Sequence, residues 1–329
     1  GVISYSMAFF QYLVKNFLMF HDVFSDTEKP DHLLIIGGGP IGIEMAQAHA
    51  RLGCRVTVVE AATIMGRDDP EIVEILKSCL IDEGINLVEG IGVTKVSKSK
   101  SRIEATLVNG VLLEASHLFV ATGQRPAIEG LDLAAADIAF TPAGIITDKR
   151  LRTSNKRVFA IGDVTGRAQF THIAGYHAGI VIRNMLFKLP VKVSENIIPW
   201  VTYSDPEMAH VGLTEAAATN LWGEEKIFVT KVPLASVDRA IAERRTKGMV
   251  KIVTQNNGRI LGASILAPNA GEMVLAWVLA IGCKQKIDKM ANLIAPYPTY
   301  GDASKKVASQ YFTKKIFNLK RTFGFNFIV

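Results

Sequence analysis

A glycine-rich turn between an apolar run and a helix-forming run constrains this chain more than any other feature. Residues 33–36 are continuously apolar, as expected of a strand buried on both faces. Gly37, Gly39 and Gly42 then follow with the spacing G-x-G-x-x-G. In such a turn the first glycine allows a tight bend, the second lets the backbone approach a pyrophosphate, and the third lets the following helix pack on the strand. The helix that residues 43–52 predict would present free N–H groups to the phosphates. The predicted dinucleotide loop comprises Gly37, Gly38, Gly39, Pro40, Ile41 and Gly42.

An acidic residue ends the next predicted strand, residues 55–59. Glu60 lies 21 positions after Gly39, where a carboxylate can bind the hydroxyls of a ribose. Its charge would repel a 2′-phosphate, and no basic cluster follows immediately. Arg67 is the nearest cation, and we interpret it as a surface residue. The pattern therefore favours NAD over NADP.

The segments after Glu60 continue an α/β pattern. Residues 70–83 predict a helix with one apolar stripe, and residues 84–90 predict another strand. Residues 101–123 predict a β-meander with a turn at Asn109–Gly110. The stripe consists of Ile72, Ile75, Leu76, Cys79 and Leu80. These elements indicate a Rossmann-like domain.

Composition excludes several classes of protein. The chain is 49% hydrophobic and 21% charged, which is typical of a globular protein. No apolar run reaches the about 20 residues that span a bilayer, and residues 7–20 are interrupted by Lys15 and lack a signal-peptide cleavage site. Cys54, Cys79 and Cys283 are too scattered for a disulfide framework or a metal site. We expect a cytoplasmic protein without a transmembrane segment or a metal.

The formal net charge of +6 belongs to the C-terminal tail. No acidic residue follows Asp302, whereas six basic residues do, so the rest of the chain is neutral. The tail mixes aromatic and basic residues and could contact an anionic membrane or a nucleic acid. Nothing that would read bases accompanies it, so we interpret it as a solvated helix and expect no nucleic-acid partner.

Four later motifs resemble the FAD-dependent pyridine nucleotide-disulfide oxidoreductases, a family that includes dihydrolipoamide dehydrogenase and mercuric reductase. They read ATGQRPAIEGLDL (121–133), TSNKRVFAIGDVTG (153–166), IPWVTYSDPEMAHVGLTE (198–215) and GRILGASILAPNAGEMV (258–274). The resemblance implies an α/β fold with a Rossmann-like NAD domain, a partial second α/β domain of FAD type and a C-terminal α+β dimerisation domain. It implies FAD and NAD as cofactors and a homodimer. The expected boundaries are 1–30 for an N-terminal extension, 31–126 for the NAD domain, 127–194 for the second half of the FAD domain, 195–313 for the dimerisation domain and 314–329 for the tail.

The resemblance also assigns residues to the flavin. Residues 158–161 predict a buried strand that stops at Gly162 and Asp163, and a carboxylate at such a strand end suits ligand hydroxyls. In the family this aspartate binds the ribitol chain of FAD. Four residues are expected against the isoalloxazine and ribityl groups, and Thr171 can cap the helix that follows. We interpret His172 and His177 as packing or backbone-positioning residues rather than catalytic ones. The four residues are Gln169, Phe170, Thr171 and His172.

Three further residues are assigned to the nucleotide. Glu44 lies on the first turns of the nucleotide helix, and in the family a glutamate at this place lies near the nicotinamide and flavin; the alternative is an exposed helix glutamate. Gly123 would bring backbone close to the NAD ribose and nicotinamide. Val93 falls where the family packs a residue near the adenine.

Parts of the family pattern are missing. Nothing before residue 31 supplies the first FAD motif, because the only glycine there is Gly1. The redox pair Cys-x-x-x-x-Cys is also missing, since the closest two cysteines, Cys54 and Cys79, are 25 positions apart. We therefore expect a processed, tagged or truncated chain. The absent half-domain would leave an apolar sheet edge, which residues 7–20 could cover.

The family's His-Pro-Thr and glutamate, an acid–base pair that protonates the leaving thiol, are replaced. Tyr297 stands at the histidine position and Asp302 at the glutamate position. A tyrosine, with a pKa near 10, is a poor base at neutral pH, which argues against disulfide turnover. Mercuric reductases place a tyrosine near here, but their terminal cysteine pair is absent. We interpret Tyr297 as an interface residue with a possible catalytic role.

Two hypotheses follow. The first is an NAD(P)H-dependent flavin oxidoreductase, of which this chain is a truncated part, with a disulfide, metal ion, quinone or oxygen as acceptor. The second is a non-catalytic remnant that binds NAD and dimerises as a structural subunit.

Overall fold

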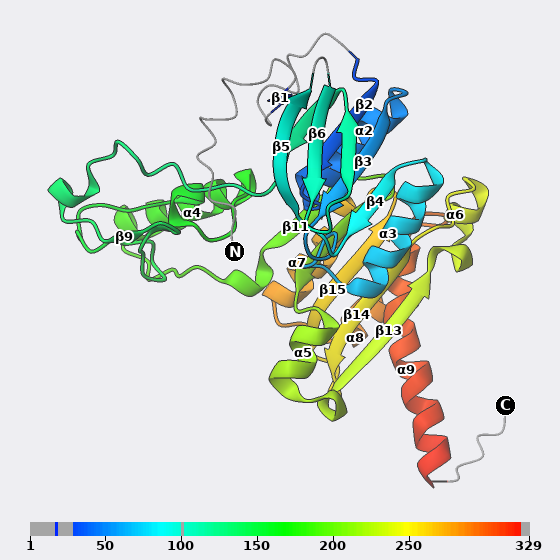
Figure 1. Ribbon diagram of the computed structural model, residues 1–329. Helices are drawn as coiled ribbons and strands as arrows, with labels where there is room; N and C mark the ends of the chain where they lie inside the picture. The colour runs from blue at the N-terminus through cyan, green and yellow to red at the C-terminus, as the bar shows by residue number, and fades with distance from the viewer. Residues whose placement is uncertain (1–16, 19–28, 100–101, 324–329) are drawn as a thin grey trace. The chain divides into compact units, whose positions relative to one another are not determined.

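The computed structural model describes residues 17–18, 29–99 and 102–323 of the 329-residue chain (Figure 1). The chain divides into two compact units. One is formed by Gly1–Thr122 and Val201–Val329, and the other by Gly123–Trp200. The glycine-rich turn and the C-terminal region therefore belong to one unit.

A parallel sheet carries the glycine-rich turn. Its strand order is β1-β8-β2-β3-β4, and every neighbouring pair is parallel. Leu33 and Ile35 of β2 pack into one hydrophobic cluster, and Leu34 packs into another on the opposite face. The apolar run is therefore continuous because both faces of this strand are covered. The strands are β1 (Phe17–Leu18), β2 (His32–Ile36), β3 (Arg55–Glu60), β4 (Asn86–Glu89) and β8 (His117–Val120).

Helices cover one face of this sheet and an antiparallel sheet covers the other. Ile43 of α2 (Pro40–Arg51) and Leu76 of α3 (Pro70–Asp82) pack with Leu33 and Ile35. Ile103 and Ala105 of the antiparallel sheet pack with Leu34. This second sheet has the order β5-β6-β7, with bounds Val93–Ser99, Arg102–Leu107 and Leu112–Ala115.

The predicted meander is only partly right. The turn at Asn109 and Gly110 does join β6 to β7, but the last part of the predicted meander is β8, a strand of the parallel sheet. Strand β5 was not predicted as a strand. It has the sequence VTKVSKS, which contains too many polar side chains to show the apolar pattern of a buried strand.

A five-stranded sheet forms the C-terminal region, with the order β11-β12-β15-β14-β13. Its register is antiparallel between β12 and β15, β15 and β14, and β14 and β13. Trp277 is fully buried, and its Nε1 donates to Ser304 Oγ at 3.1 Å, which joins α7 to α9. The strands are β11 (Pro199–Thr202), β12 (Glu207–Gly212), β13 (Ile227–Pro233), β14 (Met249–Gln255) and β15 (Ile260–Ala267). The helices are α5 (Glu215–Trp222), α6 (Asp238–Ala242), α7 (Ala270–Gly282), α8 (Ile287–Ala291) and α9 (Asp302–Phe323).

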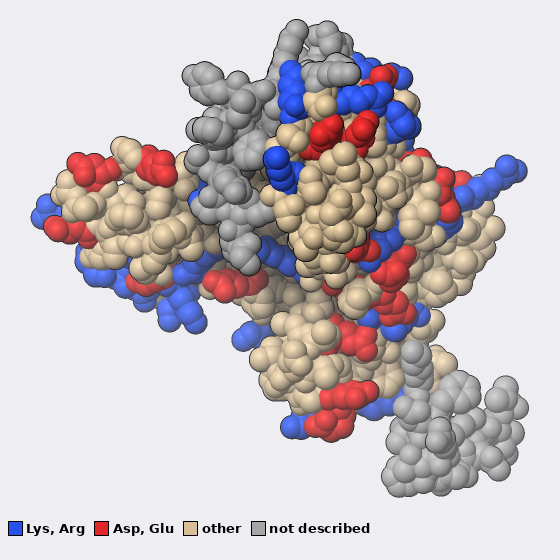
Figure 2. All heavy atoms as spheres, viewed as in Figure 1, with Lys and Arg blue, Asp and Glu red and all other residues tan. Residues whose placement is uncertain are grey.

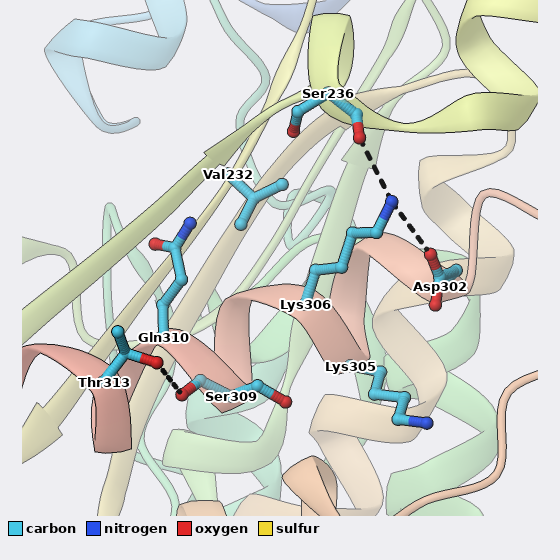
Figure 3. A pocket seen from close by; sticks show the side chains of 8 residues that line it. All are labelled: Val232, Ser236, Asp302, Lys305, Lys306, Ser309, Gln310 and Thr313. Atoms are coloured by element: carbon cyan, nitrogen blue, oxygen red, sulfur yellow. Dashed lines mark hydrogen bonds and ion pairs between the residues drawn. The ribbon is translucent and has the colours of Figure 1, made fainter. Parts of the chain in front are cut away.

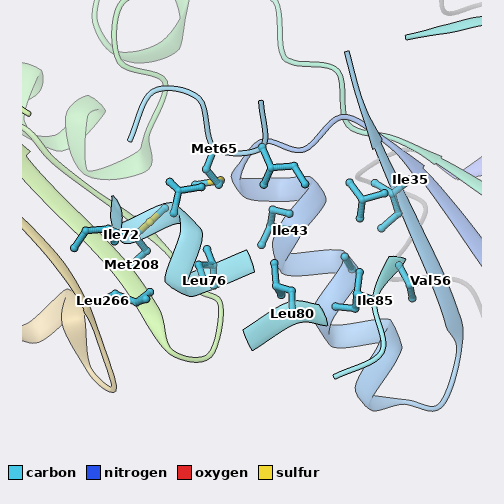
Figure 4. Packing of buried hydrophobic residues seen from close by; sticks show 14 of the residues in the cluster. Ile35, Ile43, Val56, Met65, Ile72, Leu76, Leu80, Ile85, Met208 and Leu266 are labelled. Atoms are coloured by element: carbon cyan, nitrogen blue, oxygen red, sulfur yellow. The ribbon is translucent and has the colours of Figure 1, made fainter. Parts of the chain in front are cut away.

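One hydrophobic cluster joins the parallel sheet and its helices to the C-terminal sheet. Met208 and Leu266, from β12 and β15, are buried with Ile72 and Leu76 of α3 (Figure 4). Because the two regions share one dry core, they form a single packed body rather than two tethered domains.

The unit Gly123–Trp200 contains little regular structure. It holds helix α4 (Thr171–Met185), the short pair β9 (Phe140–Thr141) and β10 (Gly144–Ile145), and the 3-10 turns η1 (Leu133–Ala136), η2 (Gly162–Thr165) and η3 (Glu195–Ile197). The predicted strand at 158–161 was wrong. Phe159 makes only an isolated bridge with Arg152, because within this unit the described residues supply no adjacent strands for a ladder.

Three observations concern membrane spans, the N-terminal segment and the surface charge. Within the described chain no helix is long and apolar enough to cross a membrane. The predicted surface cap at 7–20 lies outside the described residues except for β1, which pairs with β8 of the parallel sheet rather than with a flavin half-domain. Acidic and basic side chains are interspersed over the face that Figure 2 shows.

Candidate functional site

The three motif glycines have different surroundings. Gly37 has φ +111°, and a Cβ there would lie 2.4 Å from the carbonyl oxygen of Ala121. A Cβ on Gly42 would lie 2.0 Å from the carbonyl oxygen of Gly37. A Cβ on Gly39, by contrast, would meet nothing within 4 Å. The first and third glycines are therefore required by packing, whereas the second borders open space, as a backbone that admits a ligand must.

Helix α2 begins at this open position. Gly39 is its N-cap and supplies no capping side chain, and Pro40 occupies the first helical position. The first turn contains no acidic residue that could neutralise the helix end. The N–H groups of the first turn therefore lack side-chain caps and favour an anion.

Glu60 binds the backbone at two places, within the glycine turn and just after its own strand. Its Oε2 accepts from Gly38 N at 2.7 Å and its Oε1 accepts from Ala62 N at 2.9 Å. Each carboxylate oxygen keeps a further lone pair, so ribose hydroxyls could still donate to it. Arg67, interpreted as a surface residue, is exposed.

Glu44 is not the exposed helix residue of the alternative interpretation. It is half-buried, and its Oε1 accepts from Tyr203 N at 2.8 Å. Burial raises the pKa of its carboxyl group above the ordinary value, although the hydrogen bond from Tyr203 N opposes the shift. The carboxyl group of Glu44 thus lies on helix α2, in contact with the backbone of Tyr203 in the C-terminal region.

Val93 and Gly123 lie in different environments. Val93 is buried in the cluster beneath β2 and β3, so its side chain forms part of the core. Gly123, in the other unit, has φ +124° and open space at its Cβ position. Gly123 therefore leaves its backbone open to an approaching ligand.

A histidine side chain accepts a hydrogen bond from the backbone of the Gly162–Asp163 turn. Gly162 has φ +65°, and its N–H donates to Nδ1 of His177 at 3.1 Å. His177 is buried, which lowers its pKa and keeps Nδ1 available as an acceptor. Its interpretation as a backbone-positioning residue is confirmed. The carboxylate of Asp163 is exposed, and no residue of the described chain is hydrogen-bonded to it.

Residues 169–172 lead into α4, but not with the predicted cap. The helix begins at Thr171 itself, so Phe170 is the N-cap and no side chain caps the helix. The capping role predicted for Thr171 was therefore wrong, because a residue already inside the helix cannot cap it. His172 stacks on Phe170 at a centroid separation of 5.2 Å, and its Nε2 lies 3.0 Å from the carbonyl oxygen of Pro199. Gln169 and Phe170 are half-buried.

Tyr297 and Asp302 have different interaction partners. Tyr297 is 72% exposed, and its hydrogen bond to Asp238 raises the pKa of its hydroxyl group. Asp302 instead pairs with Lys306 at 3.2 Å, at one end of a surface groove of about 430 Å³ (Figure 3). The same lysine donates to the carbonyl oxygen of Ser236 in η5 (Leu234–Ser236) at 3.1 Å. A base at neutral pH would need the opposite pKa shift at Tyr297.

The cysteines do not provide a thiolate pair. Cys54 and Cys79 are buried, which raises the pKa of both thiols, and Cys283 is exposed. In the described part of the chain no group of three or more His, Cys, Asp or Glu residues could hold a metal ion.

Helix α2 also carries a set of polar residues whose contacts were not predicted from the sequence. Gln47 exchanges hydrogen bonds with the backbone of Asp205, and Arg51 pairs with both Glu83 and Asp205. With Glu44 these residues have the spacing i, i+3, i+7, which places them on one face of the helix. A polar stripe on a helix whose other residues are mostly apolar or small could have indicated a polar partner, though not which one.

Two family models match the chain. The one described as "Pyridine nucleotide-disulphide oxidoreductase" matches residues 11–178. The one described as "Pyridine nucleotide-disulphide oxidoreductase, dimerisation domain" matches residues 198–308. Members of this family are FAD-dependent and use NAD(P)H.

Curated relatives and a solved structure point to the same family. A mercuric reductase of Streptomyces lividans is 35% identical over 297 residues, which is 89% of this chain and 62% of that protein. A dihydrolipoyl dehydrogenase of Bacillus subtilis is 29% identical over 284 residues, 85% of this chain and 61% of the relative. The Cu(II) complex of the HOCl-induced flavoprotein disulfide reductase RclA from Escherichia coli superposes with a TM-score of 0.84 at 28% identity, covering 90% of this chain and 68% of that one. The chain thus spans about three fifths of the length of both curated relatives.

Proposed function

Because this chain belongs to the pyridine nucleotide-disulphide oxidoreductase family, we propose that it is the NAD- and FAD-binding part of an NAD(P)H-dependent flavin oxidoreductase. Within it we assign residues 31–126 to the NAD domain, 127–194 to half of the FAD domain and 195–313 to the dimerisation domain. The two sheets whose strands, apart from β1, lie within residues 31–126 and the five-stranded sheet within 195–313 support the first and last of these assignments. We place the protein in the cytoplasm.

The observation that carries the proposal is the contrast among the three glycines. Gly37 and Gly42 touch backbone that a Cβ would displace, whereas Gly39 faces open space at an uncapped helix end. A turn that only had to pack would not need a glycine at the open position, where φ is −76°. The open glycine and the free first-turn N–H groups together suit the pyrophosphate of a dinucleotide.

On the nucleotide side, Glu60 and Glu44 have distinct roles. Glu60 would accept hydrogen bonds from the adenosine ribose while it continues to hold Gly38 N. Its negative charge would disfavour a 2′-phosphate, which supports NAD. Glu44 would lie toward the nicotinamide end, as in the family.

On the flavin side, the exposed carboxylate of Asp163 would accept hydrogen bonds from ribitol hydroxyls. His177 fixes the backbone that carries it through Gly162 N, and Gln169 to His172 would lie against the flavin. The bound nicotinamide would supply a hydride, and the bound flavin would take it up. The acceptor after the flavin is left open among a disulfide, a metal ion, a quinone and oxygen.

A second candidate is a non-catalytic NAD-binding subunit. Two observations favour it: the sequence contains no Cys-x-x-x-x-Cys, and the pKa of Tyr297 is shifted away from that of a base. Under this interpretation the turn at Gly37–Gly42 binds NAD and Asp163 has no flavin partner.

The C-terminal region would join two copies of the chain. Helix α7 exposes Leu275 and Leu279, at 58% and 68% of their surface, and Ile294 after α8 is 96% exposed. These apolar side chains lie in the region that the dimerisation-domain model matches. A second copy of this chain would remove them from water, and Tyr297 would lie close to that interface.

The visible absorption spectrum of the purified chain, with and without added FAD, tests the proposal. A flavin band that bleaches on addition of NADH, and is lost in Asp163→Ala, would support the oxidoreductase. A colourless chain that still binds NADH, with binding weakened in Gly39→Ala, would support the non-catalytic subunit. Absence of NADH binding in the folded wild-type chain would refute both.

A further inference from the structure

A lysine of the C-terminal sheet is buried among carboxylates that begin two helices. Lys251 Nζ lies 2.7 Å from Asp69 Oδ2, 3.1 Å from Glu71 Oε2 and 2.6 Å from Glu215 Oε2. The side chains of Lys251 and Asp69 are only 3% and 1% exposed. Burial by itself would lower the pKa of Lys251, but its hydrogen bonds to Asp69 and Glu215 raise it overall, so the ammonium group stays charged.

Asp69 is the N-cap of α3. Its Oδ1 accepts from Glu71 N at 3.1 Å as well as from Lys251 Nζ at 2.9 Å. The lysine therefore fixes the position at which α3 begins. The same contact fixes the end of the loop 61–69, which starts directly after Glu60.

The loop 61–69 holds the glycine turn from one side. Met65 N donates to the carbonyl oxygen of Gly38 at 2.9 Å, while Gly38 N is bound by Glu60. A Cβ on Gly38 would lie 2.6 Å from Cγ1 of Ile64, so the loop lies directly against the turn. Both polar groups of Gly38 are thus bound, one by Glu60 and one by the loop.

The conformation of this loop needs external support. Met65 has φ +51°, in the left-handed region, which a non-glycine residue keeps only where its surroundings hold it. Ile64 N, next to Met65, donates to Glu89 Oε1 at 2.7 Å, and Asp69, the last residue of the loop, is held by Lys251. The second support comes from a strand 182 positions away in sequence.

We propose that Lys251 is a positioning residue for the dinucleotide site. By holding Asp69 it keeps Met65 N on the carbonyl of Gly38, and this contact keeps the turn in the shape that admits a pyrophosphate. Affinity for the adenosine half of the nucleotide then depends on the C-terminal region. The inference rests on the proposed NAD function.

The test compares Lys251→Met with Lys231→Met. Lys231, on the neighbouring strand β13, also pairs with Glu71, but it is 37% exposed and is not among the partners of Asp69. ADP-ribose binding to the whole chain is measured by calorimetry at a temperature at which circular dichroism shows both variants folded. We expect Lys251→Met to weaken binding by about 3- to 30-fold and Lys231→Met to change it less than about twofold. Unchanged affinity in a folded Lys251→Met chain would show that the lysine only stabilises the fold.

Hydrogen exchange without nucleotide separates this inference from the proposed function. The Met65 amide should exchange faster in Lys251→Met and at the wild-type rate in Lys231→Met. If wild-type chain failed to bind ADP-ribose, the NAD proposal would fall, while the exchange rates would still decide whether Lys251 holds the loop. Should Lys251→Met not fold, Asp69→Asn keeps the capping oxygen and removes the charge pair. A folded Asp69→Asn chain with wild-type exchange at Met65 would overturn the inference.

Discussion

The side-chain amide of Gln47 exchanges two hydrogen bonds with the backbone of Asp205, 158 positions away in the sequence. Its Nε2 donates to the carbonyl oxygen of Asp205 at 2.8 Å, and its Oε1 accepts from Asp205 N at 2.7 Å. Gln47 is only 3% exposed, so both bonds are shielded from water. Helix α2 is therefore bonded directly to the C-terminal region.

Replacing this amide by an apolar group should destabilise the chain. Gln47→Leu leaves the N–H and C=O of Asp205 without their partner, which costs about 1–3 kcal/mol in free energy of unfolding. Urea denaturation measures the loss. Gln124→Leu makes the same chemical change at an exposed position and should leave stability nearly unchanged. Equal stability of the two variants would show that water replaces the lost bonds.

Alanine substitutions at two glycines of the turn should affect different properties, one the stability of the chain and the other its affinity for ADP-ribose. Gly42→Ala places a Cβ 2.0 Å from the carbonyl oxygen of Gly37 and should cost about 1–3 kcal/mol of stability. Gly39→Ala meets nothing within 4 Å, so its thermal midpoint should stay near wild type. Its ADP-ribose affinity should nevertheless fall roughly tenfold, or about 1.4 kcal/mol, because the methyl group occupies the approach of the pyrophosphate. Full affinity in Gly39→Ala would argue against the assigned site.

The raised pKa of Glu44 predicts a pH effect on stability. Between its unfolded value, about 4.3, and the higher folded value, the folded chain binds more protons than the unfolded chain. The free energy of unfolding contributed by Glu44 should therefore fall as the pH rises through this window. Glu44→Gln keeps an oxygen for Tyr203 N and removes the titration. The stability of wild type relative to this variant, measured by urea denaturation across the window, should decrease with pH; an increase would contradict the assignment.

One of the two exposed leucines of α7, Leu279, should influence the oligomeric state. Leu279→Glu places a charge in the apolar surface proposed to pair two chains, and should weaken dimerisation by about 2 kcal/mol, or roughly 30-fold. Sedimentation at micromolar concentration measures this, with Leu52→Glu, a residue 69% exposed at the end of α2, as the control. A monomeric wild-type chain under these conditions would refute the homodimer.

The glycine turn could be predicted from sequence because its chemistry is local. An apolar strand, the spacing of Gly37, Gly39 and Gly42, and Glu60 follow one another within 30 residues, and each has a physical requirement that few residue types meet. The helix of residues 70–83 was likewise predicted to within a residue, since its apolar period is carried by the segment itself.

Predictions that depended on neighbours were less successful. Residues 158–161 have the composition of a buried strand, but a strand exists only where others pair with it, and within its unit no adjacent strand is described. Thr171 has the right chemistry for a cap, yet the helix begins at that residue. In both cases local composition was compatible with more than one structure.

By itself, the sequence determined where the glycine-rich turn lies, the strand and helix that flank it and the family to which the chain is similar. Only the tertiary structure decided that Gln47 binds Asp205, that Lys251 binds Asp69 and that Glu44 is half-buried beside Tyr203. Periodicity reports which face of a helix or strand is apolar, and a motif reports chemistry that lies within one segment. Contacts between polar residues 158 or 182 positions apart leave no such pattern, because their partners are chosen by the packing of the whole unit.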